Sequence, residues 1–444
     1  MTESSSPLQG WRTQILLLLL LVSGIGLLWW LDQRETQRVS EEKNARLIGK
    51  FTPKDVKKVQ FWRPATEKGK EGNTLTIARN DSAKELANPQ TSRWQIMTPE
   101  RARTNDQAVD KLLEILSASY DQKVNDSGTD RTAFGLDTPL AVLTVYNEAD
   151  QSIQISLGLS APASRKRYVQ IGVDGPVVLV PPRSVDGLMQ NPEALRDKRL
   201  FANPTVAAIQ KFSRESPNRR LELNRDKDLH WQMLSPLQDA ASDTRVNSWL
   251  ETLLHAQGSS FVTLQADETS ALQGDWLLSL HLMQDQQEKV RIQQRDNRLL
   301  AWRAGEPDAM VLESHISDEL EKPPLELIAL RPLPQGVNPN KLEATQHGKS
   351  QNGSKQGDEW SKPVWKGVEE ILTRDAWRGV PAKERGEPWL QLVAVQEQRQ
   401  WKIPVWKEGE SIILAPPERK LQLELTHFQA KAFVDTVKAL FPEE

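Results

Sequence analysis

The sequence predicts an α+β protein with an N-terminal transmembrane helix, two tandem repeated lobes of mainly antiparallel sheet with packed helices, and a partial third α+β unit. Three observations predict this fold. Residues 13–31 form an uncharged apolar stretch, and the segment 94–116 recurs at 231–253. Most of the remaining chain alternates between short strand patterns and helices with one apolar face.

The repeated segment is the clearest signal in the chain. Both copies open with Trp-Gln, reach a Pro five residues after the Trp, and continue into an Asp-x-x-Val-x-x-x-Leu pattern. That pattern is typical of a capped helix with one apolar face. Eight positions are identical between the copies, whereas unrelated segments would share about one or two. We therefore expect one structural unit that is used twice.

Bulk composition excludes several classes of function. Lys plus Arg (57) nearly balances Asp plus Glu (60), so the net charge of -3 gives no electrostatic reason to expect a nucleic-acid partner. The chain has no cysteine. Disulfides, thiolate nucleophiles, iron–sulfur clusters and cysteine zinc sites are therefore excluded.

The apolar stretch 13–31 predicts a single membrane span. As a helix it would be about 28 Å long, close to the ~30 Å of a hydrocarbon core. Trp11 at one end and Trp29 and Trp30 at the other lie where an aromatic belt is expected. A cleaved signal peptide is the alternative, but its apolar core is usually shorter and a small-x-small site should follow. We predict a short tail inside, residues 1–12, and a body outside the cytoplasm.

The first lobe is predicted at 51–200, after a charged stalk at 32–50. It opens with a hairpin at 56–61 and 75–77, followed by the Trp94 strand and a helix capped by Asn105 or Asp106. Further strands are expected at 142–146, 153–157, 167–173 and 177–180, the last two joined at Asp174-Gly175.

The second lobe, predicted at 201–335, repeats this order. Its strands are expected at 221–223, 278–282, 290–292 and 310–312, and its end, Ala329-Leu330-Arg331, matches Ala194-Leu195-Arg196. Few apolar residues occur in 336–362, which predicts a flexible linker. The segment 363–444 is expected to be a partial third unit without the Trp module. Its strands are predicted at 390–395, 401–405 and 412–414, and its helix carries Phe433, Val437, Leu440 and Phe441 on one stripe.

Motifs for catalysis or metal binding are missing from the sequence. The six histidines, His230, His255, His281, His315, His347 and His427, show no metal-ligand spacing. Gly24-Ile-Gly26 is a Gly-x-Gly inside the predicted span, where helix packing explains it better than phosphate binding. Neither a P-loop nor a Gly-x-Ser-x-Gly elbow is present. We predict no catalytic, cofactor-binding or metal-binding residues.

Three repeated residue pairs have both a functional and a structural interpretation. Asp106 and Asp243 could form a catalytic pair, but each lies where a helix needs a cap or a first-turn anion. Trp94 and Trp231 could line a pocket, but a Trp ahead of a capped helix more often fills the space between sheet and helix. The third pair, Arg196 and Arg331, could clamp an anion, but local pairing or neutralisation of helix-end carbonyls is expected.

Several of these residues resemble one bacterial family. The Trp94-Gln-Ile-Met-Thr-Pro strand, the helix after it, Phe134-Gly-Leu-Asp-Thr-Pro139, the Tyr168 hairpin and Leu195-Arg-Asp-Lys198 are similar to the domain of unknown function 4340 family. The resemblance spans about 50–330. In the second lobe, Leu272-Gln-Gly-Asp-Trp276 replaces the Phe-Gly-Leu-Asp-Thr-Pro turn. The family implies a membrane-anchored envelope protein, often encoded beside the ATPase and permease of an ABC-type system, and it implies no catalytic residues.

We therefore expect a non-enzymatic accessory subunit of an ABC-type envelope transport system. It would be anchored in the bacterial inner membrane by 13–31, with a cytoplasmic N-terminus and a periplasmic body, and would dock on the permease or ATPase. The alternative is a periplasmic module that binds a glycan, lipid or peptide in a cleft between lobes. Neither expectation involves a cofactor.

Overall fold

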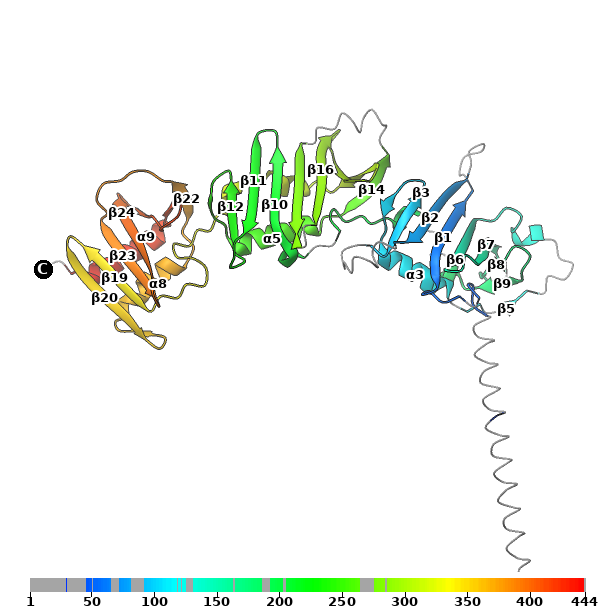
Figure 1. The fold of residues 1–444 in the computed structure, drawn as a ribbon, viewed down its shortest axis with the longest axis horizontal. Helices are drawn as coiled ribbons and strands as arrows, with labels where there is room; N and C mark the ends of the chain where they lie inside the picture. The colour runs from blue at the N-terminus through cyan, green and yellow to red at the C-terminus, as the bar shows by residue number, and fades with distance from the viewer. Residues whose placement is uncertain are drawn as a thin grey trace, which may run out of the picture. The chain divides into compact units, whose positions relative to one another are not determined.

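Three lobes of sheet and helix follow one another along the chain (Figure 1). The computed structural model describes residues 29, 45–49, 51–64, 72–80, 92–117, 119–120, 122–124, 131–162, 164–185, 192–202, 205–263, 275–283 and 286–442. The chain forms two compact units, 1–197 and 198–444. We call residues 45–197 lobe 1; lobe 2 (198–329) and lobe 3 (330–442) share the second unit.

In lobe 1, the described strands form one sheet in the order β4-β3-β2-β1-β6-β7-β8-β9-β5, with every neighbouring pair antiparallel. Helix α3 covers one face (Figure 1). The bounds are β1 Val56–Arg63, β2 Asn73–Arg79, β3 Trp94–Thr98, β4 Ala102–Arg103, α3 Asp106–Leu116, β5 Gln122–Lys123, η1 Arg131–Phe134, β6 Ala141–Asn147, β7 Ser152–Ser160, β8 Arg167–Ile171, β9 Val177–Val180, α4 Pro182–Val185 and η3 Pro192–Leu195.

Lobe 2 has the same topology, β13-β12-β11-β10-β15-β16-β17-β18-β14, which confirms that the repeated segment belongs to a repeated lobe. Strand β17 was missed by the sequence prediction. The bounds are η4 Val206–Ala208, β10 Ile209–Ser216, β11 Arg219–Arg225, β12 Trp231–Ser235, β13 Asp239–Ala240, α5 Asp243–Leu254, β14 Gly258–Thr263, β15 Trp276–Leu282, β16 Gln287–Arg295, β17 Arg298–Arg303, β18 Asp308–Leu312, α7 Ile316–Glu321 and η6 Pro324–Leu327.

Lobe 3 is a third copy of the fold. Its described strands run β21-β20-β19-β23-β24-β25-β26-β22, which is the order of lobes 1 and 2 without the β4 position. The bounds are β19 Lys341–Gln346, β20 Lys349–Gln356, β21 Glu359–Trp360, α8 Val364–Thr373, β22 Arg378–Pro381, β23 Leu390–Gln396, β24 Arg399–Glu408, β25 Ser411–Leu414, β26 Leu421–Glu424 and α9 His427–Leu440.

The prediction of a flexible linker at 336–362 was therefore wrong. Strands β19, β20 and β21 occupy most of this stretch and begin the sheet of lobe 3. Leu342 and Ala344 of β19 are buried in the lobe 3 core. Few apolar residues are needed here because β20 and β21 lie at the edge of the sheet, where polar side chains remain in water.

Part of the predicted stalk, 32–50, also belongs to a lobe. Leu47 and Ile48 are fully buried in the core of lobe 1. The Ile48 amide donates to the carbonyl of Leu116 at the end of α3, at 3.1 Å. In lobe 3, Leu333 makes the same contact with Leu372 at the end of α8, at 3.0 Å. A short segment ahead of the first strand is thus packed in the same way in both lobes.

The predicted membrane span, 13–31, lies outside the described residues apart from Trp29, and so does Gly24-Ile-Gly26. Among the helices that the structure describes, none combines the length and the apolar character needed to cross a membrane.

Lobes 2 and 3 are joined by a buried carboxylate. The side chain of Asp239 in β13 is fully buried and accepts a hydrogen bond from the Arg419 guanidinium. It also accepts from the amides of Lys420 at 3.1 Å and Leu421 at 3.0 Å. Leu421 itself packs into the core of lobe 2. Arg419 further donates to the carbonyl of Ala329 at 2.6 Å, so both ionic partners are hydrogen-bonded on several sides.

Candidate functional site

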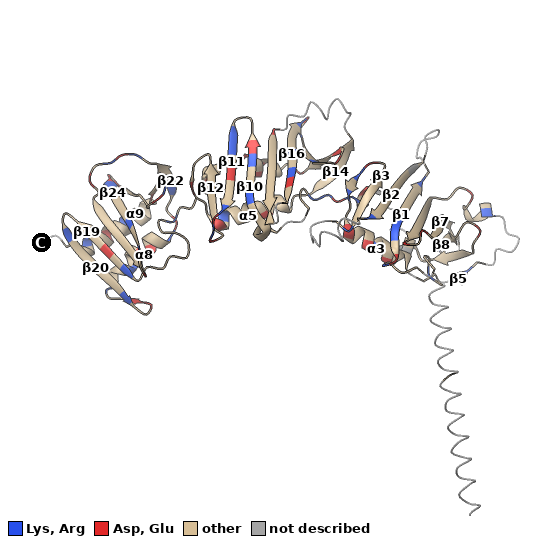
Figure 2. Ribbon diagram, viewed as in Figure 1, with Lys and Arg blue, Asp and Glu red and all other residues tan. Residues whose placement is uncertain are grey.

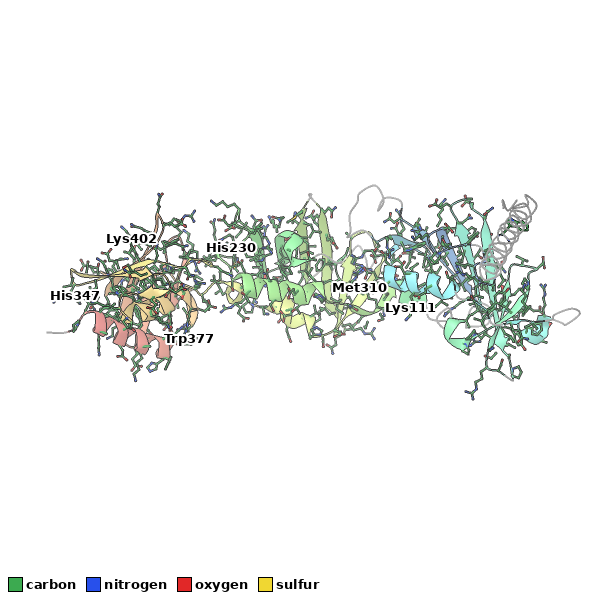
Figure 3. The ribbon with its side chains drawn as sticks, turned by 90° about the horizontal axis from the view of Figure 1, so that it is seen from below. Lys111, His230, Met310, His347, Trp377 and Lys402 are labelled. Carbon is green, nitrogen blue, oxygen red and sulfur yellow. The ribbon has the colours of Figure 1, made fainter. Side chains whose placement is uncertain are left out.

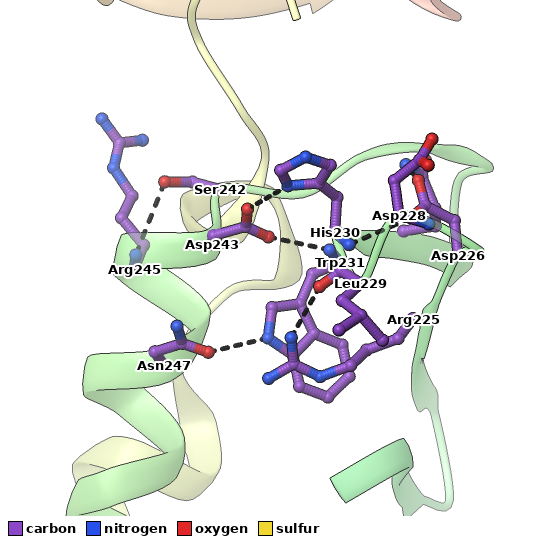
Figure 4. A network of polar contacts seen from close by, with 11 residues as sticks. Arg225, Asp226, Asp228, Leu229, His230, Trp231, Ser242, Asp243, Arg245 and Asn247 are labelled. Atoms are coloured by element: carbon purple, nitrogen blue, oxygen red, sulfur yellow. Dashed lines mark hydrogen bonds and ion pairs between the residues drawn. The ribbon is translucent and has the colours of Figure 1, made fainter. Parts of the chain in front are cut away.

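Trp231 is the centre of a packed network in lobe 2 (Figure 4). Its indole is fully buried, and its Nε1 donates to Asn247 of helix α5 at 2.8 Å. The guanidinium of Arg225, on the neighbouring strand β11, lies 4.4 Å from the ring centroid. Arg225 also donates to the carbonyls of Ile209 at 3.0 Å and Leu229 at 2.6 Å. The Trp therefore fills the space between sheet and helix, and the Arg holds it against the start of β10.

Asp243 connects this network to the first turn of α5 (Figure 4). Its Oδ1 accepts from the Trp231 amide at 2.8 Å, and its Oδ2 lies 2.6 Å from Nδ1 of His230. Ser242 is the N-cap and accepts from the Arg245 amide at 3.4 Å. A carboxylate in the first turn also interacts favourably with the helix dipole.

The charge state of His230 follows from these neighbours. The hydrogen bond with Asp243 raises the pKa of His230 above its ordinary value, against the opposing effect of burial. Asp226 and Asp228 raise it further through their charges. The imidazole is therefore a cationic partner for Asp243 over a wider pH range than a free histidine.

Lobe 1 builds a similar network in which several residues are exchanged. Asp106 accepts from the amides of Trp94 at 3.2 Å and Arg93 at 2.8 Å, and Asn105 caps the helix. Arg93 replaces the histidine and forms ion pairs with Asp106 at 3.6 Å and Asp110 at 2.5 Å. Arg79 takes the stacking position, 4.8 Å from the centroid of the Trp94 ring.

Lobe 3 contains a third version that the sequence prediction missed. Trp360 in β21 lies opposite Lys355 in β20, as Trp231 lies opposite Arg225. The Lys355 ammonium is 5.1 Å from the ring centroid and 2.5 Å from Glu369 Oε1. The indole Nε1 donates to Glu369 Oε2 at 2.7 Å. A basic residue over a Trp is thus common to all three lobes, with an expected contribution of about 0.5–2 kcal/mol each.

The sequence-predicted candidates of the Trp module thus hold elements together. Both Asp carboxylates accept backbone hydrogen bonds at a helix start, and Trp94 and Trp231 have 1% and 0% of their surface exposed. The structure brings each Asp to the Trp of its own lobe. These contacts fit the structural interpretation of each pair.

The predicted match of Arg331 with Arg196 was wrong by three residues. Thr104 forms a β-bridge with Arg196, and its counterpart Ala241 bridges to Ile328. Ile328 is therefore the structural equivalent of Arg196. Arg331 donates to the carbonyl of Val337 at 3.1 Å. Burial lowers the pKa of Arg331, although the charge of Asp375 opposes this shift.

Outside the Trp module, the titratable groups of the described residues that have shifted pKa values form ion pairs or hydrogen bonds within their own lobes. The strongest perturbation falls on Arg214, where burial and the nearby Arg219 lower the pKa to about 10. Its guanidinium donates to the carbonyls of Glu319 at 3.2 Å and Lys322 at 2.8 Å, where helix α7 ends. Across the described residues, no group of three His, Asp or Glu side chains could hold a metal ion.

An exposed aromatic surface on lobe 3 is the main candidate site. Trp377, labelled in Figure 3, is 55% exposed and Phe428, in the first turn of α9, is 81% exposed. We call Trp377, Arg378 and Phe428 the aromatic surface of lobe 3. Large exposed aromatic side chains of this kind are typical anchors of protein interfaces.

Hydrogen bonds fix this aromatic surface in place. The Trp377 amide donates to the carbonyl of Glu424 at 2.8 Å, and Arg378 lies 4.3 Å from the Trp377 ring while bonding to the Glu424 carboxylate at 2.8 Å. Burial would raise the pKa of Glu424, but hydrogen bonds from Ser411 and Arg378 bring it below its ordinary value. The carboxylate therefore stays ionised and keeps Arg378 against the indole.

The Phe428 side of the surface is equally ordered. Thr426 and Gln429 form a capping box at the start of α9. The Gln429 amide group also donates to the carbonyl of Asp375 at 2.9 Å, which ties the segment before Trp377 to the helix. The backbone segments that carry Trp377 and Phe428 are thus tied to one another within lobe 3.

Comparison with protein families identifies part of the chain. Residues 94–275 match the profile of a family described as Domain of unknown function (DUF4340). This part of the chain is therefore similar to the DUF4340 family. The DUF4340 match begins at Trp94 and includes Trp231, so it contains both copies of the Trp module and the helices that follow them. No match is found among curated proteins or among solved structures.

Proposed function

We propose that this protein is a non-enzymatic, membrane-anchored accessory subunit of a bacterial ABC-type envelope transport system. It acts by docking on the permease or ATPase of that system. The observation that carries the proposal is the aromatic surface of lobe 3, where Trp377 and Phe428 are exposed on an ordered support. The resemblance of the sequence to the DUF4340 family implies the same association with ABC-type components.

The proposal includes an orientation. Residues 13–31 anchor the chain in the inner membrane, the N-terminus lies in the cytoplasm and the three lobes lie in the periplasm. Protease digestion of intact cells, of cells with an opened outer membrane and of lysed spheroplasts tests this orientation. Digestion of the body should begin once the outer membrane is open. Protection until the inner membrane is lysed would reverse the orientation and move the docking partner to the cytoplasmic face.

Cross-linking tests the docking role. Full-length protein is cross-linked in its native membranes, solubilised in detergent and recovered by an affinity tag, and co-purifying permease is quantified. Trp377→Ala and Phe428→Ala should each reduce recovery, because truncation of an interface anchor costs about 2 kcal/mol or more, roughly 30-fold in affinity.

The control is an exposed apolar residue on another lobe. Leu325, in η6 of lobe 2, is 52% exposed, close to the value for Trp377. Leu325→Ala should leave recovery unchanged. Equal recovery of permease by all three variants would remove the aromatic surface from the proposal, and repeated absence of permease with the unmodified chain would reject the docking function itself.

A further inference from the structure

On the sheet face of lobe 1 that lies opposite helix α3, the strands β2, β1, β6 and β7 carry almost no charge. Strand register aligns Thr76, Gln60, Thr144 and Gln154 in one row across β2, β1, β6 and β7. Four neighbouring strands span about 14 Å. Every side chain in this row is a neutral amide or hydroxyl that can both donate and accept hydrogen bonds.

Aromatic rings flank this row on the same face. Trp62 and Val142 lie in the next row along the strands, and Lys58 and Tyr146 in the row on the other side. Tyr146 donates from its hydroxyl to Gln60 Oε1 at 2.8 Å, which fixes the orientation of the amide. The Lys58 ammonium covers the Tyr146 ring at 3.8 Å.

The Trp62 ring is supported from one side. A Cβ atom at Gly72 would lie 2.6 Å from Trp62 Nε1, so the absence of a side chain there lets the indole pack against the backbone. The three rows, all within the described part of lobe 1, comprise the residues Ala78, Lys58, Tyr146, Ser152, Thr76, Gln60, Thr144, Gln154, Thr74, Trp62, Val142, Ser156 and Gln170. Lys58 is the one charged residue among them, and its row continues through Gln95 of β3 to Arg103 at the β4 edge of the sheet.

The equivalent face of lobe 2 shows that the fold does not require neutral residues here. Its matching row is Glu222, Ser213, Ser279 and Lys289. Glu215 takes the place of Trp62. Lys211–Glu222 and Arg220–Glu222, the latter at 3.2 Å, are ion pairs across this face. Figure 2 shows charged residues on β16 of lobe 2, whereas β7, the equivalent strand of lobe 1, is neutral.

The chemistry of the lobe 1 face selects a class of ligand. A charged ligand would need opposite charges in the row, and a protein interface would need a more apolar centre than one Val and one Trp. A sugar ring has neutral hydroxyls that match amide and hydroxyl side chains, and its C–H face packs on an aromatic ring. We propose that the Gln60–Trp62 face of lobe 1 binds a neutral glycan chain.

This inference goes beyond docking on a permease and does not depend on it. It also places the ligand on the partly exposed region of one sheet face, around Gln60, Trp62 and Gln154, rather than in a cleft between lobes. Thr76, Ser156 and Gln170 of the same rows are buried and would support this region from its sides. A flat face fits a polymer that extends past it, because several weak contacts then act together on one chain.

Calorimetric titration of the full-length protein in detergent tests the proposal, with cellohexaose, chitohexaose and maltohexaose as probes. At least one hexasaccharide should bind. The double variant Trp62→Glu/Gln154→Lys carries the residues that lobe 2 has at these positions, Glu215 and Lys289, so the sheet should tolerate it. It should weaken binding roughly tenfold or more.

The matched control is the reverse change on lobe 2. Glu215→Gln/Lys289→Gln alters the equivalent positions there and should leave glycan affinity unchanged. Thermal unfolding of both double variants checks that the sheets remain folded. Equal binding by the lobe 1 variant, or no binding by any of the three hexasaccharides at millimolar concentration, would overturn the proposal. If the unmodified protein bound no glycan, and the lobe 1 variant failed to cross-link to a protein that the unmodified protein captures, the face would instead be a protein interface.

Discussion

Lobes 2 and 3 fill the space between sheet and helix from different directions. In lobe 2, Trp231 and Met233 of β12 enter this space and are fully buried, opposite the smaller Val246 of α5. In lobe 3, β21 ends at Trp360, which is only half-buried. The space is filled instead by Trp365 of α8, 1% exposed, at the helix position that Val109 has in lobe 1.

Strand β20 shows the compensating change. Gly353 lies two residues before the basic residue that faces the Trp, where lobe 2 has Leu223. A Cβ atom at Gly353 would lie 2.4 Å from the Trp365 ring, so the helix Trp fits only because the strand residue has no side chain. The fold therefore preserves the filled volume of this layer and not the residues that fill it.

Replacing the strand Trp with Ala should produce the largest difference in stability between the lobes. Trp231→Ala should destabilise lobe 2 by about 3–5 kcal/mol, and Trp94→Ala should do the same in lobe 1, because each leaves a large cavity. Trp360→Ala should cost about 1 kcal/mol, since Trp365 already fills the lobe 3 core. Hydrogen exchange at α3, α5 and α8 measures each lobe separately. Equal losses in all three lobes would contradict the comparison.

A second difference lies between lobes 1 and 2. Asp239 of lobe 2 occupies the sheet position that Ala102 has in lobe 1. Asp239→Ala should cost about 3 kcal/mol, because the Arg419 guanidinium would remain buried without its carboxylate. Urea unfolding monitored at lobes 2 and 3 measures the loss. The double variant Asp239→Ala/Arg419→Met should recover part of it. A double variant less stable than the single one would show that Arg419 acts mainly through the carbonyls of Ala329 and Arg331.

The fold of lobes 1 and 2 was predictable because their signals are local. Strand alternation and the helix caps at Asn105 and Ser242 can be read from short sequence windows. Because the segment 94–116 recurs at 231–253, the elements predicted in one copy support those predicted in the other. Lobe 3 was recognised only in part because its Trp360 is followed by Pro363 after three residues, without the longer Trp-x-x-x-x-Pro spacing. The polar strand β20 also carries too few apolar residues to be distinguished from a linker.

The candidate sites were less predictable. Trp377 and Phe428 belong to no periodic pattern, so their exposure depends on tertiary packing. The neutral face of lobe 1 is assembled from strands far apart in the sequence, and Gln60 meets Thr144 only through the register of β1 and β6. Predicting such a face would require the strand pairing as well as the strands themselves.

Adding one methyl group at Gly353 of β20 tests whether this glycine makes room for Trp365 in lobe 3. Gly353→Ala should destabilise this lobe by about 1–3 kcal/mol, because the Trp365 ring must move. Combining it with Trp365→Phe should restore part of the loss by making room. Leu223→Ala in lobe 2 gives the opposite, cavity-forming change at the equivalent position. A neutral effect of Gly353→Ala would mean that the helix shifts freely, and α8 would then not be the fixed element of the lobe 3 core.

The smallest expected effect is the pH dependence of lobe 2, where the cation is His230, compared with lobe 1, where it is Arg93. His230 and Arg93 both pair with the first-turn Asp of their helix, but only the histidine titrates near neutral pH. Asp243 raises the pKa of His230 in the folded protein, so the ion pair contributes fully below the ordinary value of 6.5 and is lost as pH rises through the raised folded value. Hydrogen exchange at the start of α5 should therefore become faster from pH 6 to pH 8, after correction for intrinsic rates, while α3 stays unchanged. His230→Arg should remove this dependence by giving lobe 2 the permanent cation of lobe 1, and a dependence that survives the substitution would assign it to Asp226 or Asp228 instead.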